Sequence, residues 1–222
     1  VCGEKIWPVA YSAPQQFAPR AIAGMWQQIG GQLTGQVRDG LVPANLQAVF
    51  ALESPALSEV IRDINKFSNN VMAQQLFLTL SLQARGSGNW DASREALQTW
   101  WRDRIGGEVP VFDNGSGLSR EERVSAQGLA RLLQFAWGSP TMPELMSSLP
   151  LSGLDGTLKR SKSQTIAHLK TGSLRDVAGI AGYVDAANGK RLILVAVLNH
   201  ANAQAARSAL DLLVDWTASQ KP

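Results

Sequence analysis

Apolar side chains recur at helical spacing through residues 17–148. The clearest early case is Phe17 to Ile29, where this period is followed by the helix-ending pair Gly30-Gly31. Ser54-Pro55 supplies residue types that begin helices, and a second apolar face follows it. The same period predicts helices over residues 55–67, 71–84, 91–105, 125–137 and 143–148. Two short segments, 32–38 and 46–52, are predicted to be strands.

The C-terminal part of the chain has a different pattern. Three short segments rich in apolar residues are predicted to be strands, at residues 165–173, 177–185 and 191–199. Arg175-Asp176 and Ala187-Asn188-Gly189 provide the turns between them, which indicates an antiparallel meander. Residues 203–218 then predict a final amphipathic helix. This grouping favours an α+β fold, with an antiparallel sheet of about five strands flanked by helices on both faces.

The composition excludes several classes of function. A chain of 222 residues with 45% hydrophobic content can bury a sizeable core. The net charge is +3 and the lysines and arginines are scattered, so no nucleic-acid partner is expected. No apolar run reaches about eighteen residues, so no transmembrane segment is predicted. His168 and His200 are the only histidines and lack partners at metal-site spacing, so neither a metal nor a cofactor is expected.

The first residues show no clear period and contain two prolines. Residues 1–16 are therefore interpreted as a tail or linker, separate from residues 17–222. The chain begins Val1-Cys2-Gly3 without an initiator methionine, so we expect it to be a piece of a longer protein whose targeting signal lies upstream. Cys2 is the only cysteine, and the sequence leaves open whether it is a free thiol or half of a disulfide.

Ser68-Asn69-Asn70 forms an S-x-N motif between two predicted helices. In an extended joint, Ser68 and Asn70 would point to the same side, because side chains two apart share a face. A hydroxyl and a carboxamide placed together can relay a proton and hold a peptide group. Taken alone, the same three residues also fit an ordinary helix cap, with Ser68 capping the helix that follows.

Lys170-Thr171-Gly172 forms a K-T-G motif inside a predicted strand, with Ser173 directly after it. Glycine within a strand commonly marks a close backbone approach, which a peptide pairing with the strand edge would need. The lysine charge and the threonine hydroxyl can both bind a carboxylate. The competing interpretation is a surface strand with a turn glycine.

The two motifs together make the resemblance specific. The chain resembles the C-terminal part of the class C low-molecular-mass penicillin-binding proteins of the DacB type, which are D-alanyl-D-alanine carboxypeptidases and endopeptidases. S-x-N and K-T-G belong to the signature set of this superfamily. Five stretches between residues 17 and 220 carry the likeness, in the family's order: residues 52–57, 63–70, 113–120, 155–158 and 168–174.

The resemblance implies a fold and a chemistry. The implied fold is that of the penicillin-binding protein transpeptidases and serine β-lactamases. The implied activity is that of a periplasmic serine acyl-transferase, which acts on peptidoglycan peptides ending in D-Ala-D-Ala and is a target of β-lactams. It makes residues 1–16 the end of an inserted accessory domain. Catalytic roles fall to Ser68 as proton shuttle, to Asn70 as amide holder and to Lys170, which would bind the terminal carboxylate together with Thr171. Substrate-binding roles fall to Thr171 for the carboxylate, Gly172 for clearance and Ser173, whose backbone N–H would form half of an oxyanion hole.

The third motif of the family, S-x-x-K, does not occur. The residues three positions before the lysines are Cys2, Asp63, Gly156, Lys159, Ala167, Ala187 and Ala218, and none is serine. We therefore expect the fold to be incomplete, the chain alone to be inactive, and a separate N-terminal segment carrying S-x-x-K to be its partner. Without that segment, exposed apolar surface should make the chain poorly stable. Two alternatives stay open: a serine β-lactamase or esterase on this scaffold, and a non-catalytic module that binds cell-wall peptides.

Overall fold

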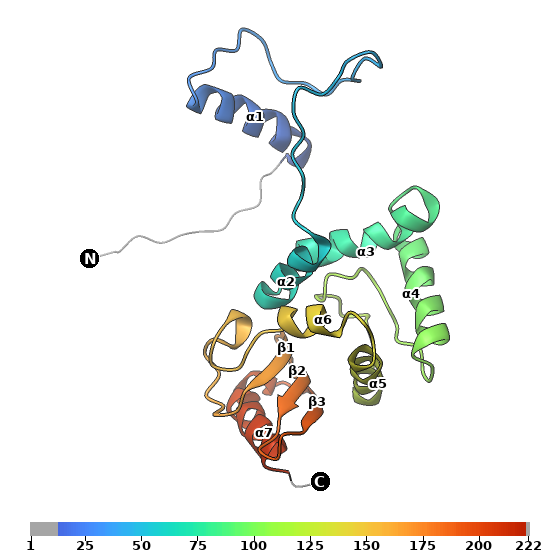
Figure 1. Ribbon diagram of the computed structural model, residues 1–222, viewed down its shortest axis with the longest axis vertical. Helices are drawn as coiled ribbons and strands as arrows, with labels where there is room; N and C mark the ends of the chain where they lie inside the picture. The colour runs from blue at the N-terminus through green and yellow to red at the C-terminus, as the bar shows by residue number, and fades with distance from the viewer. Residues whose placement is uncertain (1–12, 221–222) are drawn as a thin grey trace, which may run out of the picture. The chain divides into compact units, whose positions relative to one another are not determined.

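The computed structural model describes residues 13–220 of the chain (Figure 1). It separates into two compact units, one ending at Glu53 and one beginning at Ser54. The expectations for Cys2 and for most of residues 1–16 fall outside the described residues. None of the described helices is long and apolar enough to cross a membrane.

The first unit contains little regular structure. A short 3-10 helix, η1 (Pro14–Gln16), leads into α1 (Phe17–Gln28), which confirms the predicted helix, and Gly30 follows with φ of +88°. The predicted strands at residues 32–38 and 46–52 are wrong, because no strand forms in either segment. An isolated alternating segment cannot become a strand without a neighbour to accept its backbone hydrogen bonds. Val49 and Leu52 in the second segment, for example, are almost wholly exposed.

The helices of the second unit agree with the sequence pattern to within about two residues. Asn69, Asn89 and Ser125 cap α3, α4 and α5, because each side chain accepts the backbone N–H three residues ahead. The one larger difference is the final helix, which begins at residue 207 rather than 203 because Ala203–Ala206 form a 3-10 helix. The start of α2 differs by two residues, since Ala56 rather than Ser54 precedes it. The bounds are α2 (Leu57–Phe67), α3 (Asn70–Arg85), α4 (Trp90–Arg104), α5 (Ala126–Trp137) and α6 (Met142–Ser148).

The predicted meander is present as three antiparallel strands in the order β1-β2-β3. They are β1 (Ala167–Leu174), β2 (Val177–Asp185) and β3 (Arg191–Asn199). The 3-10 helix η2 (Gly156–Leu158) precedes the sheet, while η3 (Ala203–Ala206) and α7 (Arg207–Ser219) follow it. The α+β class and the flanking helices are confirmed. The described chain has three strands, however, where about five were expected, so the sheet is incomplete.

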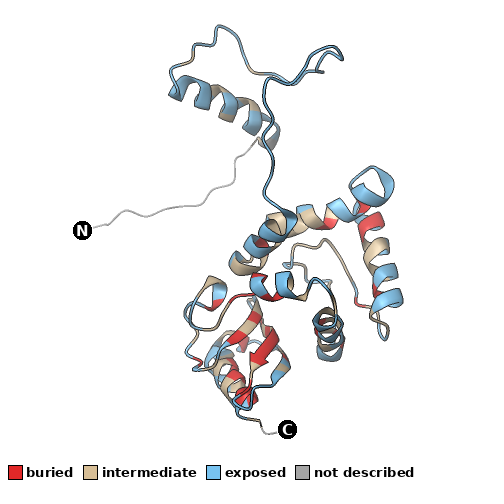
Figure 2. Cartoon of the chain, in the orientation of Figure 1, coloured by how far each residue is buried: buried red, intermediate tan, exposed pale blue. Residues whose placement is uncertain are grey.

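The sheet is covered on both faces, and the buried residues concentrate there (Figure 2). One face packs on α7, where Leu169, Ile180 and Leu194 meet Leu210 and Val214. The other face packs on α5 and α6 through a cluster of Leu133, Met146, Leu149 and Tyr183. Because side chains alternate along a strand, residues 168, 170 and 172 of β1 lie on the α6 side, and Thr171 and Ser173 lie on the α7 side.

Candidate active site

The S-x-N joint is tighter than the sequence suggested. Ser68 follows the last turn of α2 and has φ of +53° and ψ of +48°, a left-handed conformation. It is the one described residue other than glycine with positive φ. The extended joint predicted at Ser68 is therefore wrong, and so is its capping role, since Asn69 caps α3. A left-handed serine costs roughly 1–3 kcal/mol, and such strain is concentrated at functional sites.

An ion pair holds the end of α2 in place. Lys66 Nζ lies 2.6 Å from Asp155 Oδ2 and donates to the carbonyl of Leu149 at 2.7 Å. Asp155 Oδ1 accepts the backbone N–H of Leu151 at 2.8 Å. Burial raises the pKa of Asp155, but the hydrogen bonds from Lys66 and Leu151 outweigh it and hold the pKa below its usual value. The result is a rigid link from α2 to the loop that precedes β1.

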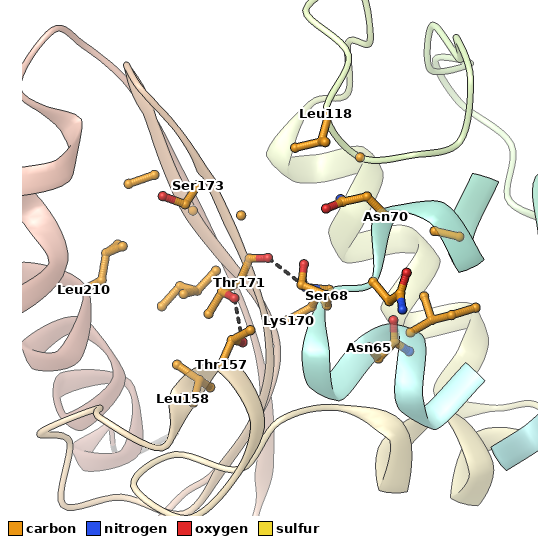
Figure 3. Close-up of a pocket in the computed structure, with 18 of the residues that line it drawn as sticks. Asn65, Ser68, Asn70, Leu118, Thr157, Leu158, Lys170, Thr171, Ser173 and Leu210 are labelled. Carbon is orange, nitrogen blue, oxygen red and sulfur yellow. Dashed lines mark hydrogen bonds between the residues drawn. The ribbon is translucent and has the colours of Figure 1, made fainter. Parts of the chain in front are cut away.

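A close backbone approach reinforces this link. Gly156 has φ of +53°, and a Cβ there would lie 2.5 Å from the carbonyl oxygen of Lys66. Only glycine allows the two segments to approach so closely. The next residue, Thr157, places its hydroxyl 2.7 Å from that of Thr171 (Figure 3). The loop therefore joins the S-x-N joint to the K-T-G strand.

The K-T-G strand, β1, is one of the two edge strands of the described sheet. In the described chain, its outer edge bonds to other backbone groups only near the start, where the N–H of Leu169 donates to the carbonyl of Pro150 at 2.9 Å. Backbone groups alternate along the strand, so the N–H groups of Thr171 and Ser173 point to the same open edge. A Cβ on Gly172 would meet nothing within 4 Å. The space beside this edge is therefore available to a peptide.

Lys170 and Ser68 meet across the cleft between these two elements. Lys170 Nζ donates to Ser68 Oγ at 3.0 Å and to the carbonyl of Thr171 at 3.0 Å, although the two side chains are 102 positions apart in the sequence. Burial lowers the pKa of Lys170. A desolvated ammonium group bonded to a hydroxyl can polarise that hydroxyl and support proton transfer through it.

Asn70 anchors the third wall of the cleft. Its amide nitrogen donates to the carbonyl of Ser116 at 2.6 Å. The loop around Ser116 is held by Asn114, whose side-chain oxygen accepts the backbone N–H of Ser116 at 3.0 Å. Gly115, with φ of +69°, lies against Phe77, and a Cβ there would clash. The glycine-rich loop at residues 113–119 therefore borders the cleft, and residues 115–118 line it.

These walls enclose a cavity of about 710 Å³. All six residues singled out from the sequence line it, and Figure 3 shows Ser68 and Asn70 on one wall and Thr171 and Ser173 on the other. Thr157 and Arg207 also line the cavity but were not selected as site residues. Thr157 lies in one of the stretches that resemble the family, yet outside the S-x-N and K-T-G motifs, and Arg207 lies in a helix whose pattern indicates only its apolar face. Other lining residues are Ile64, Asn65, Gly117, Leu118, Arg160, Leu210 and Asp211.

His168 lies outside this cleft. Its Nδ1 is 3.0 Å from the carbonyl oxygen of Met146, and burial lowers its pKa. No group of three or more potential metal ligands occurs among residues 13–220.

Comparison with known proteins places the chain in a family. The model of the D-Ala-D-Ala carboxypeptidase 3 (S13) family matches residues 2–220. A D-alanyl-D-alanine carboxypeptidase from Actinomadura sp. is 32% identical over 193 residues, which cover 78% of this chain and 35% of the relative. The D-alanyl-D-alanine carboxypeptidase DacB from Haemophilus influenzae is 24% identical over 193 residues, covering 82% of this chain and 40% of the relative. The chain thus spans well under half the length of these relatives.

Solved structures show the same fold. Penicillin-binding protein 4 (dacB) from Haemophilus influenzae, complexed with a β-lactam, gives a TM-score of 0.74 at 22% identity, covering 93% of this chain and 52% of that one. A class A β-lactamase representative from Bacteroides cellulosilyticus gives a TM-score of 0.53 at 20% identity, covering 74% of this chain and 65% of that one. The match confirms a fold of the penicillin-binding protein and serine β-lactamase type. Since the family model extends over nearly the entire sequence, this chain belongs to the D-Ala-D-Ala carboxypeptidase 3 (S13) family.

Proposed function

We propose that this chain provides two walls of a serine D-Ala-D-Ala carboxypeptidase or endopeptidase site that acts on peptidoglycan peptides and reacts with β-lactams. The observation that carries the proposal is the 3.0 Å contact between Lys170 Nζ and Ser68 Oγ inside the cleft. It joins the hydroxyl of one motif to the ammonium group of the other. A structural turn and an unrelated surface strand would have no reason to meet in this way.

The substrate peptide would lie along the open edge of β1. The backbone N–H of Ser173 points to that edge and would donate to the developing oxyanion. Asn70 would hold the amide on the acyl side of the scissile bond. When an attacking serine forms its ester bond to the carbonyl carbon, the C–N bond to the terminal D-Ala breaks. The proton that the attacking hydroxyl loses would be relayed through Ser68 to the departing amine, so Ser68 ends the step with its own proton restored. Lys170 would orient and polarise Ser68.

The attacking serine has to come from outside this sequence, since no S-x-x-K occurs in it. We propose that an N-terminal segment carrying S-x-x-K seats its helix in the cavity. The outer edge of β3 pairs with no strand of the described chain, which leaves a place for further strands. Leu212 and Trp216 on α7 expose 69% and 59% of their surface, as expected of a face that another segment covers.

The remaining assignments follow from the family. We propose that residues 17–222 are the C-terminal portion of the peptidase domain and that residues 1–16 are the tail of an accessory domain or a linker. The relatives are named D-alanyl-D-alanine carboxypeptidases, and by resemblance to that family a periplasmic location is proposed for the complete protein.

Labelling with a fluorescent penicillin, read on a denaturing gel, tests this function. The 23.9 kDa chain alone should carry no label, because an acyl adduct needs the missing serine. When it is co-expressed with an S-x-x-K-bearing N-terminal segment, that segment should be labelled. Ser68→Ala should slow the labelling by roughly 100-fold, a typical contribution of positioned acid–base groups. Ser147→Ala, on the exposed side of α6, is the matched control and should label normally.

Other outcomes would favour the alternatives. A labelled band at the mass of this chain would contradict the proposed division of the site. A label that forms and is then rapidly lost would indicate a β-lactamase on the same scaffold. Specific peptide binding without labelling in any mixture would indicate a non-catalytic binding module.

A further inference from the structure

Two asparagines of the chain are followed directly by glycine, and one of them lies in the loop that borders the cleft. They are Asn114, before Gly115, and Asn188, before Gly189. An asparagine can lose ammonia when the backbone nitrogen of the next residue attacks its side-chain carbonyl carbon. Glycine in that next position favours the attack, because no Cβ stands beside the attacking nitrogen. The structure around each pair then decides which asparagine reacts.

The side-chain oxygen of Asn114 accepts two hydrogen bonds from the same residue. The backbone N–H of Ser116 donates to Oδ1 at 3.0 Å, and the hydroxyl of Ser116 donates to it at 2.6 Å. Negative charge develops on this oxygen when a nucleophile adds to the carbonyl carbon. Two donors that already point at the oxygen stabilise that charge in the manner of an oxyanion hole.

The nitrogen that would attack is free to do so. Among the described residues, the N–H of Gly115 donates to no backbone or side-chain acceptor. Asn114 and Gly115 are only partly buried. Solvent can therefore take up the proton that this nitrogen must lose and the ammonia that leaves.

The second asparagine lacks both features. In the described chain, Asn188 Oδ1 accepts one hydrogen bond, from the N–H of Lys190 at 2.9 Å. The N–H of Gly189 donates to the carbonyl of Ala186 at 3.0 Å, and this bond has to break before the nitrogen can attack. Asn188 is the more exposed of the two asparagines, so exposure alone would predict the opposite order of reactivity.

A chemical change at Asn114 would reach the cleft through its neighbour. The carbonyl of Ser116 accepts the hydrogen bond from Asn70 Nδ2 at 2.6 Å, so this loop holds the Asn70 side chain in place. Deamidation replaces the neutral amide of Asn114 with a carboxylate, which is a charge-changing modification. When the product is isoaspartate, the main chain just before Ser116 also gains a methylene group.

We propose that Asn114 is a site of spontaneous deamidation that releases Asn70 from the loop. Hydroxide takes the proton from the Gly115 nitrogen, which forms a bond to Asn114 Cγ. The bond from Cγ to the side-chain nitrogen breaks, that nitrogen takes a proton from water, and ammonia leaves a cyclic imide. Water then opens the imide to aspartate or isoaspartate. The net reaction adds water and releases ammonia, and it does not depend on the proposed function.

Incubation of the folded chain at mildly alkaline pH, followed by peptide mass spectrometry, measures the reaction at both asparagines. Asn114 should react faster than Asn188, and the two rates should become similar in the urea-unfolded chain. Ser116→Ala should slow the reaction at Asn114 roughly tenfold, which is less than an enclosed oxyanion-hole donor contributes because this loop is partly exposed. Ser116→Thr keeps the hydroxyl and should restore the rate. Ser119→Ala is the matched control, since that hydroxyl accepts from the N–H of Glu121 instead.

The aged protein provides a second readout. In the ¹⁵N-labelled chain, a new set of Asn70 side-chain amide signals should grow in step with the modified fraction. Faster reaction at Asn188 would overturn the assignment, and so would a rate at Asn114 that Ser116→Ala leaves unchanged or increases. Modification of Asn114 without any change in the Asn70 signals would overturn its link to the cleft.

Discussion

The ion pair between Lys66 and Asp155 should be a main determinant of stability near the cleft. It joins the last turn of α2 to the loop before β1, so it fixes the two elements that carry Ser68 and Lys170. The Lys66 side chain is only 11% exposed and that of Asp155 is 38% exposed. Asp155→Asn removes the charge but preserves the shape, and it leaves a nearly buried ammonium with the carbonyl of Leu149 as its remaining partner.

The expected loss of stability lies between the values known for buried and for exposed ion pairs. Removing one partner of a fully buried pair costs about 3–5 kcal/mol, whereas exposed pairs contribute roughly 0.2–1 kcal/mol. Because Asp155 is partly exposed, the cost should be smaller than for a fully buried pair. We therefore expect Asp155→Asn to lower the free energy of unfolding by about 1–3 kcal/mol. For a unit of this size a loss near 2 kcal/mol lowers Tm by roughly 4–8 °C.

Urea denaturation at pH 7 measures this loss, with Glu95→Gln as the matched control. Glu95 pairs with Arg85, and their side chains are 63% and 56% exposed, so the control should lose less than about 0.5 kcal/mol. The lowered pKa of Asp155 means that its contribution is present above its unfolded pKa and is lost as pH falls below about 4. The difference between wild type and Asp155→Asn should therefore shrink at pH 3. Equal losses for the two variants at pH 7 would refute the role assigned to the pair.

Three further predictions concern other contacts. Gly156→Ala should destabilise by about 2 kcal/mol or more in the same denaturation assay, because its Cβ would clash with the carbonyl of Lys66 at positive φ; a neutral effect would contradict the close approach. Burial lowers the pKa of His168, so stability should fall as pH drops through about 6.5, and His168→Gln should flatten that dependence; an unchanged profile would show that His168 titrates normally. Tyr183→Phe should cost about 1 kcal/mol in urea, since it removes the 2.7 Å bond to the carbonyl of Leu133; no loss would mean that this bond adds nothing.

The helices, the three-stranded meander and the motif residues could be predicted because each depends on residues that are close together in the sequence. The amphipathic period located the helices, and cap residues such as Ser125 placed their starts to within about two residues. The turns at residues 175–176 and 187–189 are where the strands reverse, so the meander was predictable with its order. The six site residues could be selected because they belong to motifs, and the structure brings all six to one cavity.

What the sequence could not supply depends on contacts between distant segments. The strands expected at residues 32–38 and 46–52 do not form. Alternating apolar and polar residues favour a strand, but a strand also needs a neighbouring strand to accept its backbone hydrogen bonds. The left-handed conformation of Ser68 has no local signal, since serine rarely adopts it without surrounding packing. The Lys66–Asp155 pair joins positions 89 apart, and the place of Arg207 depends on how α7 packs against the sheet.

We propose that the S-x-N joint and the K-T-G strand form opposite walls of one peptide-binding cleft. The most direct measurement is a titration of the ¹⁵N-labelled chain with a peptide ending in D-Ala-D-Ala, followed through its backbone amide signals. We expect the signals of Ser68, Asn70, Gly172 and Ser173 to shift together with a single binding constant, while those of α4 do not move. Shifts confined to one of the two walls, or found only elsewhere, would contradict it.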